Sequence, residues 1–177
     1  MKIIHVAALT LALTFWAWAQ PIGKTLPEFT FQTTDGKSVT LSELRQQPPG
    51  GVLLLTFWCT DCASCRATEE SLAWMTKEYA KQARVVAIAS SANDTAESIE
   101  AYLRKHGPKI HVLLDPNGDF AHYLKVNTTT TSSVVDRSGR LRYYGTLKRG
   151  KRFFAQQPLK EVLGGKIVGQ PRGPIYG

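Results

Sequence analysis

Cysteine is scarce in this chain, which has three Cys among 177 residues. That number is too small for the dense disulfide framework of small secreted domains, so a hydrophobic core must supply most of the stability. Histidine is scarce as well, and His106, His111 and His122 include no i, i+4 pair that would suggest a helical metal site. The 43% hydrophobic composition is sufficient for one domain with such a core.

Acidic residues are the minority charge, since 14 Asp and Glu stand against 22 Lys and Arg, for a formal net charge of +8. A basic excess can attract nucleic acid or anionic lipid. Part of the excess is concentrated at Lys148, Arg149, Lys151 and Arg152. The chain has no basic stripe with interleaved aromatic residues and no nucleic-acid motif, so we predict no nucleic-acid partner. We interpret the cluster as a solvated basic turn, for which contact with a membrane is neither required nor excluded.

Long apolar runs are also missing, except near the N-terminus. Lys2 gives a basic start, residues 3–16 are mostly apolar, and Ala17-Trp18-Ala19 is a small-x-small cleavage site before Gln20. The run is short for a membrane span, which needs about 20 residues. We therefore predict a signal peptide over residues 1–19, with an uncleaved membrane anchor as the alternative. Export to the periplasm or the medium would place the cysteines in an oxidising compartment.

The three cysteines are gathered in one short segment. Cys62 and Cys65 form a Cys-x-x-Cys directly after the apolar run 52–58 and at the start of a helical pattern. At this spacing both sulfurs fall on one helix face, and the helix N-terminus stabilises a thiolate at Cys62, lowering its pKa from about 8.5. A purely structural disulfide is less expected, because closing a loop of two residues gains little entropy. The segment therefore predicts redox chemistry.

Cys59 forms a second Cys-x-x-Cys that overlaps the first at Cys62. Three thiols at this spacing could hold a soft metal ion or exchange disulfide partners. We favour the simpler interpretation that Cys59 is a small packed thiol, and we keep it as an accessory thiol. The sequence analysis accordingly predicts no metal site and no cofactor.

Hydrophobic patterning predicts alternating strands and helices. Residues 52–58 and 84–90 are expected as buried strands, with a long helix over 63–81 between them. The other expected elements are a hairpin at 29–41, a helix with a capping box of Asp94 and Glu97, a strand at 110–114, a short helix from Asp119, a second hairpin at 132–145 and a closing helix at 158–163. We predict an α/β fold with a central mixed β-sheet, helices on both faces and an N-terminal β-hairpin extension. The domain is expected over 20–167, followed by a loose C-terminal tail over 168–177.

Several short motifs occur in a recognisable order around the Cys-x-x-Cys. They are Pro27-Glu28-Phe29, Asp35-Gly36-Lys37, Phe57-Trp58, Asp115 with Gly118, Tyr123 with Val126, and Val135-Asp136 with Gly139. From Pro27 to Leu163 the chain resembles the thioredoxin-like superfamily, specifically the exported TlpA-type thiol-disulfide oxidoreductases and the wider redoxin (AhpC/TSA) group. The resemblance implies a thioredoxin-like fold, with Cys62 as the nucleophile and Cys65 as the resolving thiol.

The resemblance also implies the partners, which are protein or small-molecule disulfides and an upstream redox protein. Two rival functions stay open. One is a peroxiredoxin-like thiol peroxidase with an antioxidant role, using Cys59 or Cys62, although Val52 stands where the peroxiredoxin motif has Pro. The other is a thioredoxin-like module with little turnover that binds a metal or a partner protein.

The chain departs from the family pattern at two positions near the cysteines. Thr130 occupies the place of the usual cis-proline, and we expect a trans bond before it because a cis bond before a non-proline residue costs about 2.5 to 4 kcal/mol. Thr56 stands where thioredoxin has a buried carboxylate, so deprotonation of Cys65 would need water or another group. We expect Trp58, Thr129 and Thr130 to shape the substrate contact surface, and Asp61 to oppose the lowering of the Cys62 pKa.

The leader generates the first testable prediction. In its native host the mature protein should begin near Gln20, because signal peptidase cleaves after a small-x-small motif that follows an apolar segment. Intact mass spectrometry of the protein from an exported fraction checks this. Recovery of a chain that keeps Met1 or Lys2 in the membrane fraction would replace the cleaved leader with an anchor.

Overall fold

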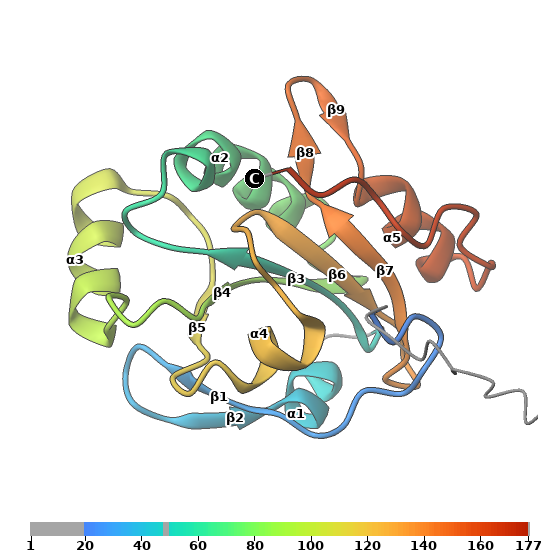
Figure 1. The fold of residues 1–177 in the computed structure, drawn as a ribbon, viewed down its shortest axis with the longest axis horizontal. Coiled ribbons are helices and arrows are strands. Elements are labelled where there is room, and N and C mark those ends of the chain that lie inside the picture. The colour runs from blue at the N-terminus through green and yellow to red at the C-terminus, as the bar shows by residue number, and fades with distance from the viewer. Residues whose placement is uncertain (1–19, 48–49, 177) are drawn as a thin grey trace, which may run out of the picture.

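The computed structural model describes residues 20–47 and 50–176. The predicted leader lies outside these residues. A seven-stranded sheet forms the centre, with strand order β2-β1-β5-β4-β3-β6-β7 (Figure 1). The strands are β1 Thr30–Thr33, β2 Ser38–Thr40, β3 Val52–Trp58, β4 Ala83–Ala89, β5 Val112–Leu114, β6 Thr131–Val135 and β7 Leu141–Thr146.

The sheet is mixed, as predicted. Strand β3 pairs in parallel with β4, and β4 pairs in parallel with β5. The pairs β3–β6, β6–β7, β1–β5 and β1–β2 are antiparallel. Every residue of β3 is buried, which explains why its sequence is almost entirely apolar rather than alternating.

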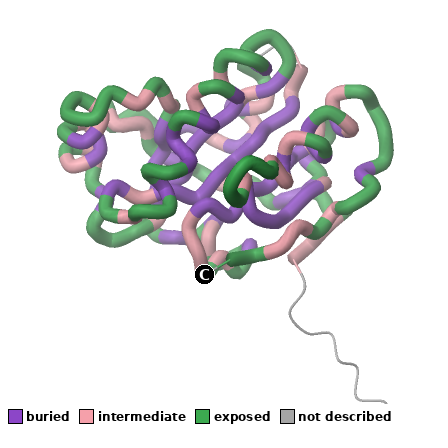
Figure 2. Tube along the Cα trace, turned by 90° about the horizontal axis from the view of Figure 1, so that it is seen from above, coloured by how far each residue is buried: buried purple, intermediate pink, exposed green. Residues whose placement is uncertain are grey.

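Within residues 20–47 and 50–176, five helices cover the two faces of the sheet. They are α1 Leu41–Gln46, α2 Ala63–Glu78, α3 Ala96–His106, α4 Asp119–Leu124 and α5 Gln156–Leu163. Leu72 of α2, Ile99 of α3 and Leu159 of α5 belong to one core cluster. Leu44 of α1 and Phe120 of α4 belong to the other. Figure 2 shows the buried strands crossing the middle of the molecule with exposed segments around them. The predicted fold class, with helices on both faces, is therefore confirmed.

The start of α3 differs from the sequence prediction. Thr95 is the N-cap residue, and its hydroxyl accepts from the Ser98 amide while the Ser98 hydroxyl accepts from the Thr95 amide. Asp94 and Glu97 do not form the capping box. The Asp94 carboxylate instead accepts from the backbone and hydroxyl of Thr60, so a contact distant in sequence replaces the local one.

The basic cluster near residue 150 forms the turn of a small hairpin, and Arg149, Lys151 and Arg152 are exposed, as expected of a solvated basic turn. Strands β8 (Lys148–Arg149) and β9 (Arg152–Phe153) pair with each other in a separate two-stranded sheet. The guanidinium of Arg149 lies 4.0 Å from the ring centre of Tyr176, and that of Arg152 lies 4.6 Å from the ring centre of Phe154. Each of the two guanidinium groups therefore packs on an aromatic ring while its residue stays exposed to solvent.

The C-terminal residues do not form the loose tail that the sequence suggested. The Tyr144 amide donates to the Pro171 carbonyl, the Gly173 amide donates to the Tyr144 carbonyl, and the Thr146 amide donates to the Pro174 carbonyl. The segment therefore runs beside β7 and satisfies backbone groups at an edge of the sheet (Figure 1).

None of the helices in the described part of the chain combines the length and apolar character needed to cross a membrane.

The close approach of the C-terminal segment to β7 gives a second prediction. A Cβ on Gly173 would stand 2.2 Å from the Tyr143 hydroxyl oxygen, whereas a Cβ on Gly169 would have its nearest neighbour at 3.9 Å. Gly173→Ala should therefore lower the free energy of unfolding by about 1–3 kcal/mol and speed amide exchange at Tyr144 and Thr146. Gly169→Ala is the matched control and should change stability by less than about 0.5 kcal/mol.

Denaturant unfolding and amide exchange read by mass spectrometry measure both effects. Equal stability and equal exchange in the two variants would show that residues 171–174 do not hold β7 in solution.

Candidate active site

The reactive segment lies where β3 ends and α2 begins. The N-cap residue of α2 is Cys62, and its carbonyl accepts from the amides of Cys65 and Arg66 at 3.1 and 3.2 Å. No side chain caps this helix end, and the backbone of Cys65 hydrogen-bonds the Cys62 sulfur. All three cysteines are free thiols.

Cys62 is a half-buried thiol surrounded by hydrogen-bond donors. The hydroxyl oxygens of Ser64 and Thr129 each lie 2.9 Å from its Sγ. Partial burial opposes the thiolate, but hydrogen bonds from these two hydroxyls and from the Cys65 backbone outweigh it and lower the pKa of Cys62 to about 6. The Asp61 carboxylate was expected to raise the pKa of Cys62, but the net effect of the surroundings is to lower it. Near neutral pH, Cys62 is therefore mainly a thiolate, the nucleophilic form of cysteine.

Cys65 has the opposite character. Its side chain is fully buried, and burial raises the pKa of this thiol far above its ordinary value. Its Sγ accepts a hydrogen bond from the Cys59 amide at 3.4 Å. The pair thus joins an accessible thiolate at Cys62 to a buried, protonated thiol at Cys65.

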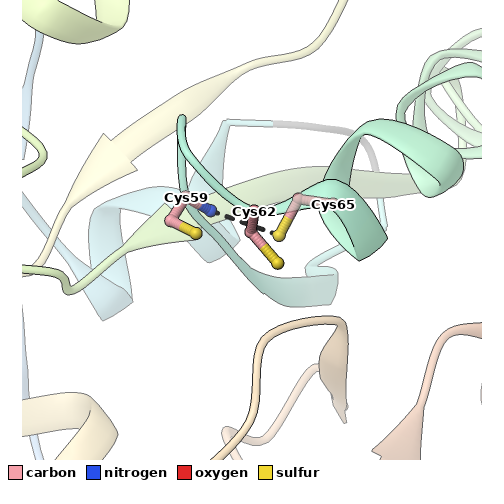
Figure 3. Close-up of side chains that lie close together, drawn as sticks. All are labelled: Cys59, Cys62 and Cys65. Atoms are coloured by element: carbon pink, nitrogen blue, oxygen red, sulfur yellow. Dashed lines mark hydrogen bonds between the residues drawn. The ribbon is translucent and has the colours of Figure 1, made fainter. Parts of the chain in front are cut away.

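Cys59 completes a cluster of sulfurs. The Sγ atoms of Cys59, Cys62 and Cys65 all lie within 4.8 Å of one another (Figure 3). Burial and the neighbouring Cys62 raise the pKa of Cys59 to about 11, so it is protonated when Cys62 is a thiolate. Cys59 also lines an open hollow of about 370 Å³ together with Thr129 and His122. Among the described residues, these sulfurs form the one His, Cys, Asp or Glu group that could share a metal ion.

The loop before β6 lies opposite Cys62, as the sequence alignment with the family predicted. The Thr130 amide donates to the Phe57 carbonyl at 2.7 Å, and the Thr130 carbonyl accepts from the Leu147 amide at 2.9 Å. No cis peptide occurs among residues 20–47 and 50–176, which agrees with the expected trans bond before Thr130. Thr130 instead adopts a left-handed backbone with φ of 64°. Its backbone groups are used within the protein and are not free to pair with a substrate.

The three residues expected at the contact surface are placed differently. Thr129 is only partly buried and lies beside the reactive sulfur. Trp58 and Thr130 are only 2% and 8% exposed, so they offer little surface that a substrate could contact. Of the three residues, Thr129 is the one placed beside the reactive sulfur, and its contact with a substrate stays a prediction.

Two buried carboxylates hold the segment between β3 and α2. The sequence pattern did not single out Glu69 and gave Asp94 a different role, that of a helix cap. Glu69 is buried and accepts from Trp58 Nε1 at 3.0 Å and from the Tyr102 hydroxyl at 2.9 Å. Asp94 accepts from Thr60 Oγ1 at 2.7 Å and from the Thr60 amide at 3.1 Å. The position of Glu69 four residues after Cys65 was the signal available, since it puts both on one helix face.

Thr56 offers a hydroxyl where thioredoxin has its buried proton acceptor. The Thr56 side chain is buried, and its hydroxyl is 2.8 Å from that of Ser132. A hydroxyl pair of this kind is not basic near neutral pH, so deprotonation of Cys65 needs water or another group.

Comparison with known proteins identifies relatives over most of the chain. A family model described as Redoxin matches residues 21–163. The thiol:disulfide interchange protein DsbE homolog of Paracoccus denitrificans is 30% identical over 131 residues, 72% of this chain and 69% of its own length. Thiol-disulfide oxidoreductase ResA of Bacillus thuringiensis is 28% identical over 122 residues, 68% of this chain and 66% of its own length, which is just under two thirds.

A solved structure extends the similarity to the fold. The crystal structure of a hypothetical protein from Sinorhizobium meliloti superposes with a TM-score of 0.75 at 27% identity, covering 88% of this chain and 91% of that one. The family model spans every strand of the seven-stranded sheet and all five helices. The chain therefore belongs to the redoxin family of thioredoxin-like proteins.

Proposed function

We propose that this protein is an exported thiol-disulfide oxidoreductase that works through Cys62 and Cys65. The observation that carries the proposal is the contrast between the two sulfurs. Hydrogen bonds lower the pKa of Cys62 to about 6 against the opposing effect of burial, while burial keeps Cys65 protonated. Disulfide exchange requires a nucleophilic thiolate that attacks the substrate and a second, resolving thiol next to it that releases the mixed disulfide.

In the reducing direction the Cys62 thiolate attacks one sulfur of a substrate disulfide. The substrate S–S bond breaks, its other sulfur leaves as a thiolate, and a mixed disulfide forms at Cys62. Cys65 then loses its proton to water and attacks Cys62 Sγ. The second substrate thiolate leaves, so two electrons have moved to the substrate and a Cys62–Cys65 disulfide remains. The same steps in reverse make the oxidised protein an oxidant.

Thr129 and Ser64 act through their hydroxyl groups wherever Cys62 is a thiolate. They donate to Cys62 Sγ when it attacks in the first step, and in the reverse direction they stabilise Cys62 as the leaving group when a second partner thiolate attacks the partner's sulfur of the mixed disulfide. Because Thr56 supplies no base, the attack by Cys65 should be the slower step.

Two further observations support the proposal. The relatives include proteins named for thiol-disulfide oxidoreduction and disulfide interchange. The leader pattern over residues 1–19 supports export, and an exported dithiol needs an upstream redox partner to reset it after each turnover. Protein or small-molecule disulfides are the substrate class.

The third prediction assigns the sulfurs. Cys62→Ser should abolish disulfide exchange because it removes the nucleophile. Cys65→Ser should trap a mixed disulfide through Cys62, because nothing then releases it. Cys59→Ser should keep exchange within about threefold of the unmodified protein, since the pair that reacts is intact. Insulin reduction and non-reducing gels measure these outcomes.

If Cys59→Ser were as damaging as Cys62→Ser, the working pair would be Cys59 with Cys62. Rapid consumption of hydrogen peroxide with a thiol donor, without insulin reduction, would instead favour the peroxidase alternative.

The fourth prediction concerns pH. Since the pKa of Cys62 is lowered to about 6, its alkylation by iodoacetamide should be half-maximal near that pH and fall as the pH decreases further. Thr129→Val removes a hydroxyl at 2.9 Å and should move the midpoint upward, toward the ordinary value of about 8.5. Thr128→Val is the matched control, because the Thr128 hydroxyl bonds Thr131 and not Cys62.

Peptide mapping of the alkylated protein reports Cys62 separately from the other cysteines. A midpoint above about 8 in the unmodified protein, or equal shifts in the two Thr variants, would refute the role of Thr129.

A further inference from the structure

Cys59 is not needed for the exchange proposed above, yet its sulfur joins those of Cys62 and Cys65. Cys59 follows β3, Cys62 caps α2, and Cys65 lies in the first helical turn. The turn between β3 and α2 brings their three Sγ atoms within 4.8 Å of one another. In Figure 3 the three side chains lie close together, with the sulfurs of Cys62 and Cys65 next to each other and that of Cys59 to one side.

This spacing is close to what one metal ion requires. Metal–sulfur bonds are about 2.3 Å long, so three sulfurs around one ion in a plane lie about 4 Å apart. Small side-chain rotations at the two half-buried residues, Cys59 and Cys62, would bring the cluster to that separation. Cys65 is already held in position by its hydrogen bond from the Cys59 amide.

The donor atoms select the kind of ion. Within the described part of the chain, no His or carboxylate belongs to the cluster, so the site offers sulfur ligands only. Thiolates favour soft ions such as Cu(I) and Zn(II) over Mg²⁺ or Ca²⁺. Zn(II) prefers four ligands, and a hydroxyl such as that of Thr129 is a poor fourth one. Cu(I) can be coordinated by three thiolates alone, so the three cysteine sulfurs fit Cu(I) best.

The cluster is also accessible. Cys59 lines the open hollow of about 370 Å³ beside Thr129, which gives a small ion a path to the sulfurs. The N-terminal end of α2 carries a positive partial charge that favours a thiolate at Cys62. Near neutral pH, where Cys62 is already mainly a thiolate, binding requires that the thiols of Cys59 and Cys65 release their protons to water as the metal–sulfur bonds form, with no change in the oxidation state of the ion or of sulfur.

We infer that the reduced protein binds one Cu(I) ion through the Sγ atoms of Cys59, Cys62 and Cys65. The sequence analysis predicted no metal site, and the convergence of the three sulfurs in the folded protein is the new observation. The bound ion occupies both sulfurs of the proposed exchange pair, so metal binding and disulfide exchange exclude each other. This exclusion rests on the proposed function, whereas the binding itself does not.

An anaerobic competition titration of the reduced full chain with Cu(I) and a chromophoric Cu(I) chelator tests the site. The unmodified protein should take up one Cu(I) per chain. Cys59→Ser should lower the Cu(I) affinity by at least about 100-fold, since loss of even a supporting group beyond the ligands costs about 10–100-fold. Ser91→Ala, a change at the rim of the same hollow, is the control and should bind as the unmodified protein does.

X-ray absorption of the loaded protein should find three sulfur neighbours for copper, and two in Cys59→Ser. Protein oxidised to the Cys62–Cys65 disulfide should bind no Cu(I). A parallel titration with Zn(II) should give weaker binding than Cu(I).

Equal Cu(I) affinity in the unmodified protein and Cys59→Ser would overturn the inference, as would two sulfur neighbours in the unmodified protein. Binding to the disulfide form would place the ion elsewhere, and tighter binding of Zn(II) would overturn the choice of ion. Circular dichroism of each variant establishes that it is folded. Because the titration contains no disulfide substrate, its result is independent of whether the protein turns over disulfides.

Discussion

The reactive end of the molecule depends on the antiparallel pairing of β3 with β6. In this register Thr56 lies opposite Ser132, and their buried hydroxyls hydrogen-bond at 2.8 Å. The pairing carries the preceding loop past the end of β3, where the Thr130 amide reaches the Phe57 carbonyl. Thr129 therefore lies 2.9 Å from Cys62 although 67 residues separate them. A slip of one residue would turn the side chains of β6 to the opposite face and remove this contact.

Three sulfurs with the same intrinsic chemistry acquire different reactivity from their surroundings. Burial raises the pKa of Cys65 and, with the help of Cys62, that of Cys59 to about 11. At Cys62 the hydroxyls of Ser64 and Thr129 outweigh burial, and the pKa falls to about 6. The balance between desolvation and hydrogen bonding, rather than the Cys-x-x-Cys spacing alone, therefore decides which sulfur attacks.

Buried carboxylates hold the chain on both sides of Cys59. Glu69 accepts from the indole of Trp58, just before Cys59, and Asp94 accepts from Thr60, just after it. Burying a carboxylate is costly unless it is hydrogen-bonded, so each contact constrains the path of the chain as well as compensating part of the cost of burial. The same constraint keeps Cys59 close to Cys62 and Cys65, which is what makes a shared ion geometrically feasible.

The sequence by itself determined the features that depend on short-range pattern. The bounds of β3, the starts of α2 and α4, and the position of Cys62 and Cys65 at a strand-to-helix junction followed from apolar runs and chain punctuation. The order of motifs indicated the family, and the alternation of expected strands and helices indicated the mixed sheet. Tertiary structure alone decided that Glu69 is buried and that residues 171–174 run beside β7. It also decided that Asp94 accepts a hydrogen bond from Thr60 instead of capping the helix that follows it. Each of these contacts joins elements far apart in the chain, and local propensity carries no information about which distant polar group will be the better hydrogen-bond partner.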